Sequence, residues 1–164
     1  MEQPIPKAVL IAALGASHAA LESVVSQVPL ERITEPGACG SWSVKDVLAH
    51  VAVENDWLAL QLERRTRGEV PGPEELQRNQ ELGLDDNETR NAYYAHQHRD
   101  LDLAYVRDWD RRANERMLVA LAELPESRLQ EPDWWTYGRA LGSVFDIDHD
   151  REHAQDIQRW LGQS

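Results

Sequence analysis

The chain has 164 residues, of which 41% are hydrophobic, a size and composition that predict one folded domain over residues 1–164 rather than a disordered tail. Its 29 acidic and 17 basic side chains give a net charge of −12. A field of that sign repels phosphate backbones and anionic lipid, so we expect neither nucleic-acid nor membrane partners, whereas metal ions are compatible with it.

The N-terminal residues and the cysteine content bear on the compartment. Cys39 is the single cysteine, which excludes an internal disulfide framework and suits a reducing cytoplasm. Residues 1–4 lack the basic start of a secretory signal, and apolar stretches such as residues 8–14 are too short to span a bilayer. We therefore expect a cytoplasmic protein.

The first predicted helix starts near Lys7, after Pro6, and is ended by Pro29. Its apolar positions follow a 3.6-residue period: Val9, Leu10, Ala13, Leu14, Leu21, Val24, Val25 and Val28. His18 lies in this helix and is interpreted as an ordinary packed or surface histidine, with a cavity-facing histidine as the alternative.

A strong start signal marks the second predicted helix, after an irregular connection. Ser43 can cap the backbone N–H of Asp46, whose carboxylate suits the positive start of a helix, as in a capping box. Trp42 and Val47 occupy the positions of a hydrophobic staple. The apolar spacing carries this helix through about Thr66.

His50 lies between apolar positions of the second helix, so its side chain should face the core or the edge of the core. Alone, such a histidine is interpreted as a hydrogen-bonded core residue, and Glu54, one turn later, as a solvated carboxylate. The two together on one face, with Trp57 close by, favour a polar cavity.

A Gly- and Pro-rich segment follows, and residues 74–99 predict short helices. His96 and His98 diverge by about 200° on a helix, so they are interpreted as surface residues rather than a metal pair. Asp100 is the predicted N-cap of a third long helix, which is stopped by Pro125.

The last predicted helix is capped by Thr136, after a connection in which Trp134 and Trp135 either line a pocket mouth or close the end of the core. Its apolar face forms a ladder in steps of four and then three: Leu141, Phe145, His149, His153, Ile157 and Trp160. His149 and His153 therefore share one face about one turn apart, where two imidazoles can reach one divalent metal.

Four long helices joined by connections of unequal length predict an all-α fold. We expect a four-helix bundle with a short helical excursion between the second and third long helices. No Gly-rich phosphate loop, CxxC motif or serine elbow is indicated. A homodimer would cover the exposed apolar residues of so short a bundle.

The order and surroundings of the histidines resemble those of the DinB-like superfamily of four-helix-bundle metalloproteins. Residues 42–50, Trp-Ser-Val-Lys-Asp-Val-Leu-Ala-His, look like the start of the second helix of that superfamily. Residues 148–153, Asp-His-Asp-Arg-Glu-His, look like its fourth-helix motif and are most similar to the ClbS/DfsB branch. The resemblance implies that His50, His149 and His153 bind a divalent metal, usually nickel or zinc.

Members of this superfamily with known activity are mostly thiol-dependent transferases or isomerases, and one ClbS-like member opens a strained electrophilic ring by hydrolysis. The resemblance thus implies a metal-dependent small-molecule enzyme, a hydrolase or thiol transferase acting on an electrophilic or toxic metabolite. A ligand-sequestering protein and a bundle with hydrogen-bonded core histidines are the two alternatives.

Further roles follow from positions near the proposed ligands. Glu54 is predicted to be the general base or a hydrogen-bond partner of a ligand, with Asp146 and Glu152 as further candidates for the partner role. The predicted walls of an apolar substrate pocket are Trp57, Trp134 and Tyr137.

Overall fold

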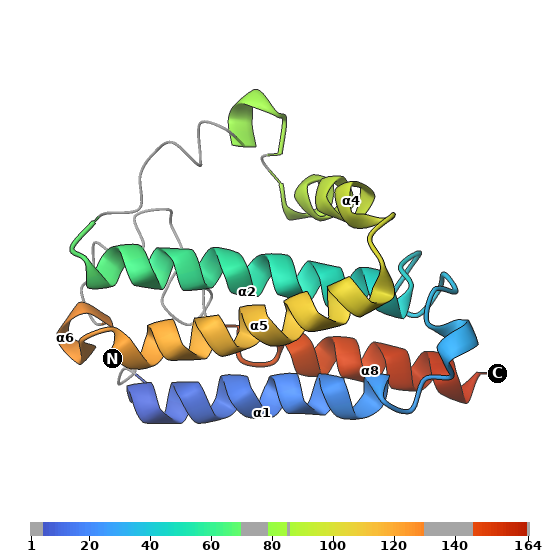
Figure 1. The fold of residues 1–164 in the computed structure, drawn as a ribbon, viewed down its shortest axis with the longest axis horizontal. Coiled ribbons are helices and arrows are strands. Elements are labelled where there is room, and N and C mark those ends of the chain that lie inside the picture. Colours follow the sequence, from blue (N-terminus) through green and yellow to red (C-terminus); the bar gives the residue numbers. More distant parts are fainter. Residues whose placement is uncertain (1–4, 70–78, 85, 130–145, 164) are drawn as a thin grey trace.

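The structure is a computed structural model that describes residues 5–69, 79–84, 86–129 and 146–163 (Figure 1). Its longest helices are α1 (Lys7–Val25), α2 (Val44–Thr66), α5 (Leu103–Glu123) and α8 (His149–Gly162). The shorter elements are the 3-10 turn η1 (Leu30–Arg32), α4 (Asn87–His98) and α6 (Glu126–Leu129). The described residues form no β-strand, and the predicted all-α fold is confirmed.

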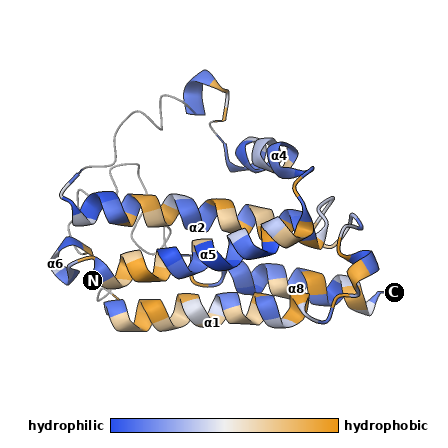
Figure 2. Cartoon of the chain, in the orientation of Figure 1, coloured by the Kyte–Doolittle hydropathy of each residue, from blue (hydrophilic) through white to orange (hydrophobic). Residues whose placement is uncertain are grey.

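The long helices form the bundle, and α4 lies outside it. α1, α2 and α5 run side by side, and α8 accompanies only one half of their length (Figure 1). α2 packs on α5, and α1 packs on both α5 and α8. α4 lies against α2 with no buried residue, and Figure 2 shows it largely hydrophilic, whereas α1 is mostly hydrophobic. The expected helical excursion between the second and third long helices is therefore present.

Two clusters of buried apolar side chains fill the bundle. The first lies in the half that α8 covers: Leu21, Val25, Val28, Ile33, Ala38, Val44, Val47, Leu48, Ala49, Val51, Val106, Ala154 and Ile157. The second lies in the other half: Leu10, Leu14, Leu58, Ala59, Leu62, Met117, Ala120, Leu121, Leu124 and Leu129. Each fully buried aliphatic side chain stabilises the fold by about 1.5–3 kcal/mol. The first cluster fixes α8 against α1 and α2.

The last helix begins later than predicted. Residues 146–148 are not helical, so an unbroken helix from Thr136 is wrong, and the part of the predicted ladder before residue 146 lies outside the described residues. The side chain of Asp146 accepts a hydrogen bond from the backbone N–H of Asp148 at 3.2 Å. Such a local turn competes with the helical hydrogen-bond pattern, so α8 begins at His149.

Two other helix ends also differ from the prediction. Asp102, not Asp100, caps α5, and its side chain accepts from the backbone N–H of Ala104 at 3.3 Å. α1 ends at Val25, before the predicted stop at Pro29. After Val25 the backbone continues in tighter turns, in which Gln27 and Val28 donate to the carbonyls of Val24 and Val25.

α1 is a core helix. Within the described residues it is the one helix long and apolar enough to cross a membrane by length and composition, a result that the short apolar stretches of the sequence did not predict. Its buried side chains are Leu10, Leu14, Ser17, His18, Leu21 and Val25. They face α5 and α8, the helices on which α1 packs.

Candidate metal centre

His50 is placed by the start of α2. The hydroxyl of Ser43 accepts from the backbone N–H of Asp46 at 3.1 Å, and the Asp46 carboxylate accepts from the backbone N–H of Ser43 at 2.8 Å. The predicted capping box is therefore present. His50 is 8% exposed, and its ring centre lies 5.0 Å from that of Trp42. A capped helix and a packed indole restrict the orientation of this imidazole.

The loop before α2 brings Trp42 and Cys39 to the same region. The carbonyl of Trp42 accepts from the N–H groups of Gly37, Ala38 and Cys39 at 3.1, 2.9 and 3.2 Å. Gly37 and Gly40 have φ of 109° and 58°, in the left-handed region that favours glycine. These two glycines allow the tight reversal that holds Cys39 near α8.

His149 is the first residue of α8, and His153 follows one turn later. Asp148, at the N-cap position, makes no side-chain cap. Ser17 of α1 takes that role, because its hydroxyl accepts from the backbone N–H of Arg151 at 3.0 Å. A hydroxyl from a neighbouring helix thus sets where the α8 histidines begin.

The three predicted ligands converge. Nε2 of His50 lies 3.0 Å from Nε2 of His149, and one ligand atom from each of the two and from His153 lies within 4.8 Å of the others. On a tetrahedral zinc ion, with Zn–N bonds of about 2.0–2.1 Å, two imidazole nitrogens are about 3.3 Å apart. The donor set therefore fits a divalent metal.

His50 and His153 are held neutral. Burial, together with the charge of the neighbouring His149, lowers the pKa of His50 to about 3 and that of His153 to about 4. A neutral imidazole has a lone pair to give, so near pH 7 both side chains are in the protonation state that metal binding requires.

His149 has a carboxylate behind it. Its Nδ1 lies 3.1 Å from Oδ1 of Asp150. Burial lowers the pKa of His149, but the hydrogen bond to Asp150 and the charge of Glu54 outweigh burial and the pKa is raised. Burial raises the pKa of Asp150, but hydrogen bonds from His149 and His18 outweigh it and hold that pKa well below its ordinary value.

His18 and Asp110 are the residues that the sequence analysis missed. His18 is 3% exposed, its Nδ1 lies 2.9 Å from Oδ2 of Asp150, and its Nε2 lies 3.5 Å from Oδ2 of Asp110. Burial raises the pKa of Asp110 to about 7. Burial lowers the pKa of His18, but the hydrogen bond to Asp150 and the charge of Asp110 outweigh burial and raise it. The available signal was the position of His18, four residues after Leu14 on the buried face of the first helix.

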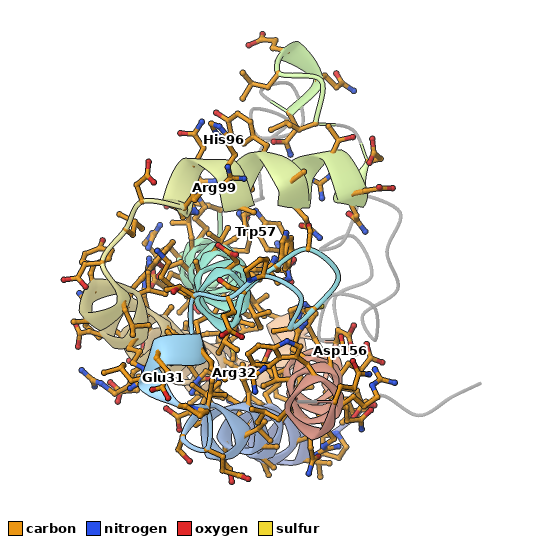
Figure 3. The ribbon with its side chains drawn as sticks, turned by 90° about the vertical axis from the view of Figure 1, so that its right-hand side faces the viewer. Glu31, Arg32, Trp57, His96, Arg99 and Asp156 are labelled. Carbon is orange, nitrogen blue, oxygen red and sulfur yellow. The ribbon has the colours of Figure 1, made fainter. Side chains whose placement is uncertain are left out.

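Cys39 contacts the other side of His153. Its Sγ lies 3.6 Å from Nδ1 of His153, and the thiol donates to Oδ2 of Asp156 at 3.2 Å. Figure 3 shows Asp156 on α8, below the loop that carries Cys39. Burial, together with Asp156, raises the pKa of the Cys39 thiol to about 11. These three residues form a second group that could hold a metal, and it shares His153 with the first group.

Glu54 lies at the open edge of the three histidines. Its carboxylate oxygens lie 3.9 Å from Nε2 of His50 and 3.8 Å from Nε2 of His149, and its side chain is 51% exposed. From this position the Glu54 carboxylate can contact a molecule bound at the ligand atoms, either directly or through a water molecule.

The remaining predicted site residues are Trp57, Trp134, Tyr137, Asp146 and Glu152. Trp57 is 44% exposed, on the side of α2 toward α4 (Figure 3). Trp134 and Tyr137 lie outside the described residues. Asp146 and Glu152 are exposed, and no hydrogen bond joins either side chain to a ligand histidine in the described part of the chain.

Trp42 is the aromatic residue that contacts the site. It also lines a surface cavity of about 530 Å³, together with Lys45 and Arg99. Its ring also packs on His50, so Trp42 contacts both this cavity and the site. The staple residue of the helix start is therefore also a wall of the site.

One comparison with known proteins gives a match. A family model described as the mycothiol maleylpyruvate isomerase N-terminal domain matches residues 14–157, a segment that contains all three histidines. No curated protein and no solved structure gives a significant match. The ClbS/DfsB branch is not confirmed by this match. The chain belongs to the mycothiol maleylpyruvate isomerase N-terminal domain family, within the DinB-like superfamily.

Proposed function

We propose that this protein is a metal-dependent enzyme that activates a thiol for attack on an electrophilic small molecule. The observation that carries the proposal is the convergence of His50, His149 and His153. Three neutral ligands leave coordination positions open and do not cancel the charge of a divalent metal, as in catalytic rather than structural sites. Nickel and zinc both suit imidazole ligands.

A divalent metal held there supplies Lewis acidity, which lowers the pKa of a thiol or a water toward neutrality. In this proposal the protein contributes the rest: His50, His149 and His153 hold the ion, and the Glu54 carboxylate accepts the proton that the incoming nucleophile loses. The distances of 3.9 and 3.8 Å from Glu54 to His50 and His149 support this role. Trp42 packs on His50 and lines the cavity beside it.

Two observations bear on the choice between a thiol and water. The description of the matching family names mycothiol, a thiol, which supports thiol transfer or thiol-dependent isomerisation. The exposed Glu54 carboxylate could equally orient a water molecule, which supports hydrolysis, the reaction implied by the ClbS/DfsB resemblance. Thiol transfer is the first candidate and hydrolysis the second.

The proposed surroundings are a cytoplasm, where low-molecular-weight thiols are kept reduced. The proposed partner is a small electrophile. The described site residues come from one chain, so a homodimer is compatible with this chemistry but is not needed for it.

The test uses protein purified without a histidine tag. We expect elemental analysis to find about one nickel or zinc per chain, and the His149→Ala variant to lose it. The loaded protein is then incubated with epoxide or maleyl-type electrophiles, with and without a low-molecular-weight thiol, while thiol and electrophile are both measured. Loss of the electrophile only with thiol supports transfer, and loss without thiol supports hydrolysis. A wild-type protein that binds no metal, or that binds it as well after His149→Ala, overturns the proposal.

A further inference from the structure

A buried chain of polar contacts runs from α5 through α1 to the metal centre. Asp110 of α5 lies 3.5 Å from Nε2 of His18, and Nδ1 of His18 lies 2.9 Å from Oδ2 of Asp150. The other oxygen of Asp150 lies 3.1 Å from Nδ1 of His149. The side chains of His18, Asp110 and Asp150 are 3%, 4% and 13% exposed, so water has little access to these contacts.

The chain of contacts fixes where the protons sit on two rings. A carboxylate has no proton to give, so each imidazole donates to Asp150 from Nδ1. In neutral His149 the remaining nitrogen, Nε2, then bears the lone pair, and that nitrogen faces His50. Proteins that bind metals through histidine commonly orient the ring in this way, with an acceptor behind the ligand.

His149 needs such support more than the other two ligands. It is the first residue of α8, where the backbone N–H groups have no partner within the helix, and Asp150 follows it directly in sequence. His18, by contrast, lies in the middle of α1, eleven residues after Lys7, with its ring buried. A buried residue of α1 therefore holds the start of α8 through one shared carboxylate.

We propose that Asp150 and His18 are positioning residues, which hold His149 in the tautomer and orientation that present its Nε2 to the metal. Asp110 closes the other end of the chain by facing His18. This inference rests on the proposed function in that it assumes a metal at the three histidines. The competing explanation is that His18 only ties α1 to α8, with no effect on the ligand.

The first measurement uses wild-type protein without metal, so it cannot fail through misfolding of a variant. At a pH above the raised pKa of His149, where this ring is neutral, nitrogen-15 correlation spectra distinguish its two tautomers. We expect an Nδ1–H tautomer for His149, and the Asp150→Asn variant should change or mix it, because an amide can donate to Nδ1. An Nε2–H tautomer of His149 in the wild type overturns the proposal, whether or not the protein binds metal.

The second measurement is zinc affinity, by competition with a chromophoric chelator. We expect His18→Leu to weaken zinc binding about tenfold, the lower end of the range for residues behind a metal ligand. His18→Asn keeps an N–H donor near the position of Nδ1, so it should restore affinity to within about threefold of wild type. The matched control is Glu22→Gln, since Glu22 is 54% exposed and 3.9 Å from Nε2 of His18; it should leave affinity unchanged.

The outcomes separate the two proposals. If the wild type binds no zinc, the proposed function fails, and the tautomer of His149 still decides the positioning role. If zinc binds and the leucine and asparagine variants lose affinity equally, or neither loses any, His18 is a structural residue and the positioning role is overturned.

Discussion

The bundle holds two sets of buried polar side chains that meet at Asp150. The metal set is His50, His149 and His153; burial lowers the pKa of His50 and His153, and both imidazoles are neutral. The second set is His18, Asp110 and Asp150. His18 is at least as buried, yet its pKa is raised, because Asp150 and Asp110 face its two nitrogens. The contrast teaches that burial alone does not decide the protonation of a histidine: a carboxylate within reach reverses the effect of burial.

The largest expected effect is on the metal set. Replacing His50 by alanine should weaken zinc binding by about 70- to 900-fold, since about 10–16 kcal/mol over four ligands corresponds to about 2.5–4 kcal/mol for each. The metal-free variant should lose less stability than the His18 variant described next, because removing His50 costs the packing of one buried ring but leaves no buried carboxylate without its cation. Chelator competition and thermal unfolding with a chelator present check the two statements. Equal zinc affinity in the variant would remove the distinction between the two sets.

The opposite result is expected for the second set. His18→Leu should destabilise the metal-free protein by about 3 kcal/mol, the lower end of the cost of removing one partner from a buried ion pair. The loss arises because Asp110 and Asp150 then face each other without a cation between them. Urea unfolding measures the free energy. Adding Asp110→Asn to the same chain should recover part of the loss, and a loss of under about 0.5 kcal/mol would mean that His18 bears no buried charge pair.

The metal set was the more predictable of the two from sequence. His50 follows a capping box whose residues are adjacent in the chain, and His149 and His153 are four residues apart, so local geometry already aligns them. Helix periodicity and caps act over a few residues, and a single sequence carries that information. The helical fold and the α4 excursion were predictable for the same reason.

The second set depends on contacts across the chain. Asp150 and His18 are 132 positions apart in sequence, and Ser17 caps α8 over a comparable distance, so neither contact has a local pattern. The start of α8 was mispredicted for a different reason: helix propensity favours continuation, but a local turn formed by Asp146 and Asp148 competes with it. Cys39 likewise reaches His153 only through the fold.

The free energy of unfolding should depend on pH in opposite ways for the two sets, and this effect should be smaller than those of the substitutions above. Below the unfolded pKa of 6.5, the unfolded chain takes up protons at His50 and His153, whereas the folded protein, with pKa values of about 3 and 4, does not. Their contribution to stability is therefore lost as the pH falls below 6.5. Between pH 6.5 and about 5 the loss is about 2 kcal/mol for each histidine, at 1.36 kcal/mol per pH unit.

The second set should act in the opposite direction. The raised pKa of His18, and that of Asp110 at about 7, mean that the folded protein binds protons more tightly than the unfolded chain. That contribution is present at lower pH and is lost as the pH rises through these values. A His50→Gln/His153→Gln variant without metal should thus lose the decline at acid pH and keep the decline at alkaline pH. Urea unfolding at several pH values measures both, and equal curves for the two proteins would contradict the assignment.

The smallest effect is expected at Cys39, and it tests which group of side chains holds the metal. If the ion lies among the three histidines, Cys39 only contacts Nδ1 of His153, and Cys39→Ser should change zinc affinity by less than about tenfold, because a hydroxyl can still contact this nitrogen. If the ion instead lies among Cys39, His153 and Asp156, losing the sulfur ligand should weaken binding a few hundred-fold, and His50→Ala should have little effect.

A cobalt-loaded sample gives an independent readout, because a sulfur ligand adds an intense charge-transfer band in the near ultraviolet. We expect no such band, since the thiol has a raised pKa and donates to Asp156. A band that disappears in Cys39→Ser would move the metal to the sulfur side of His153 and leave His50 and His149 as a hydrogen-bonded pair.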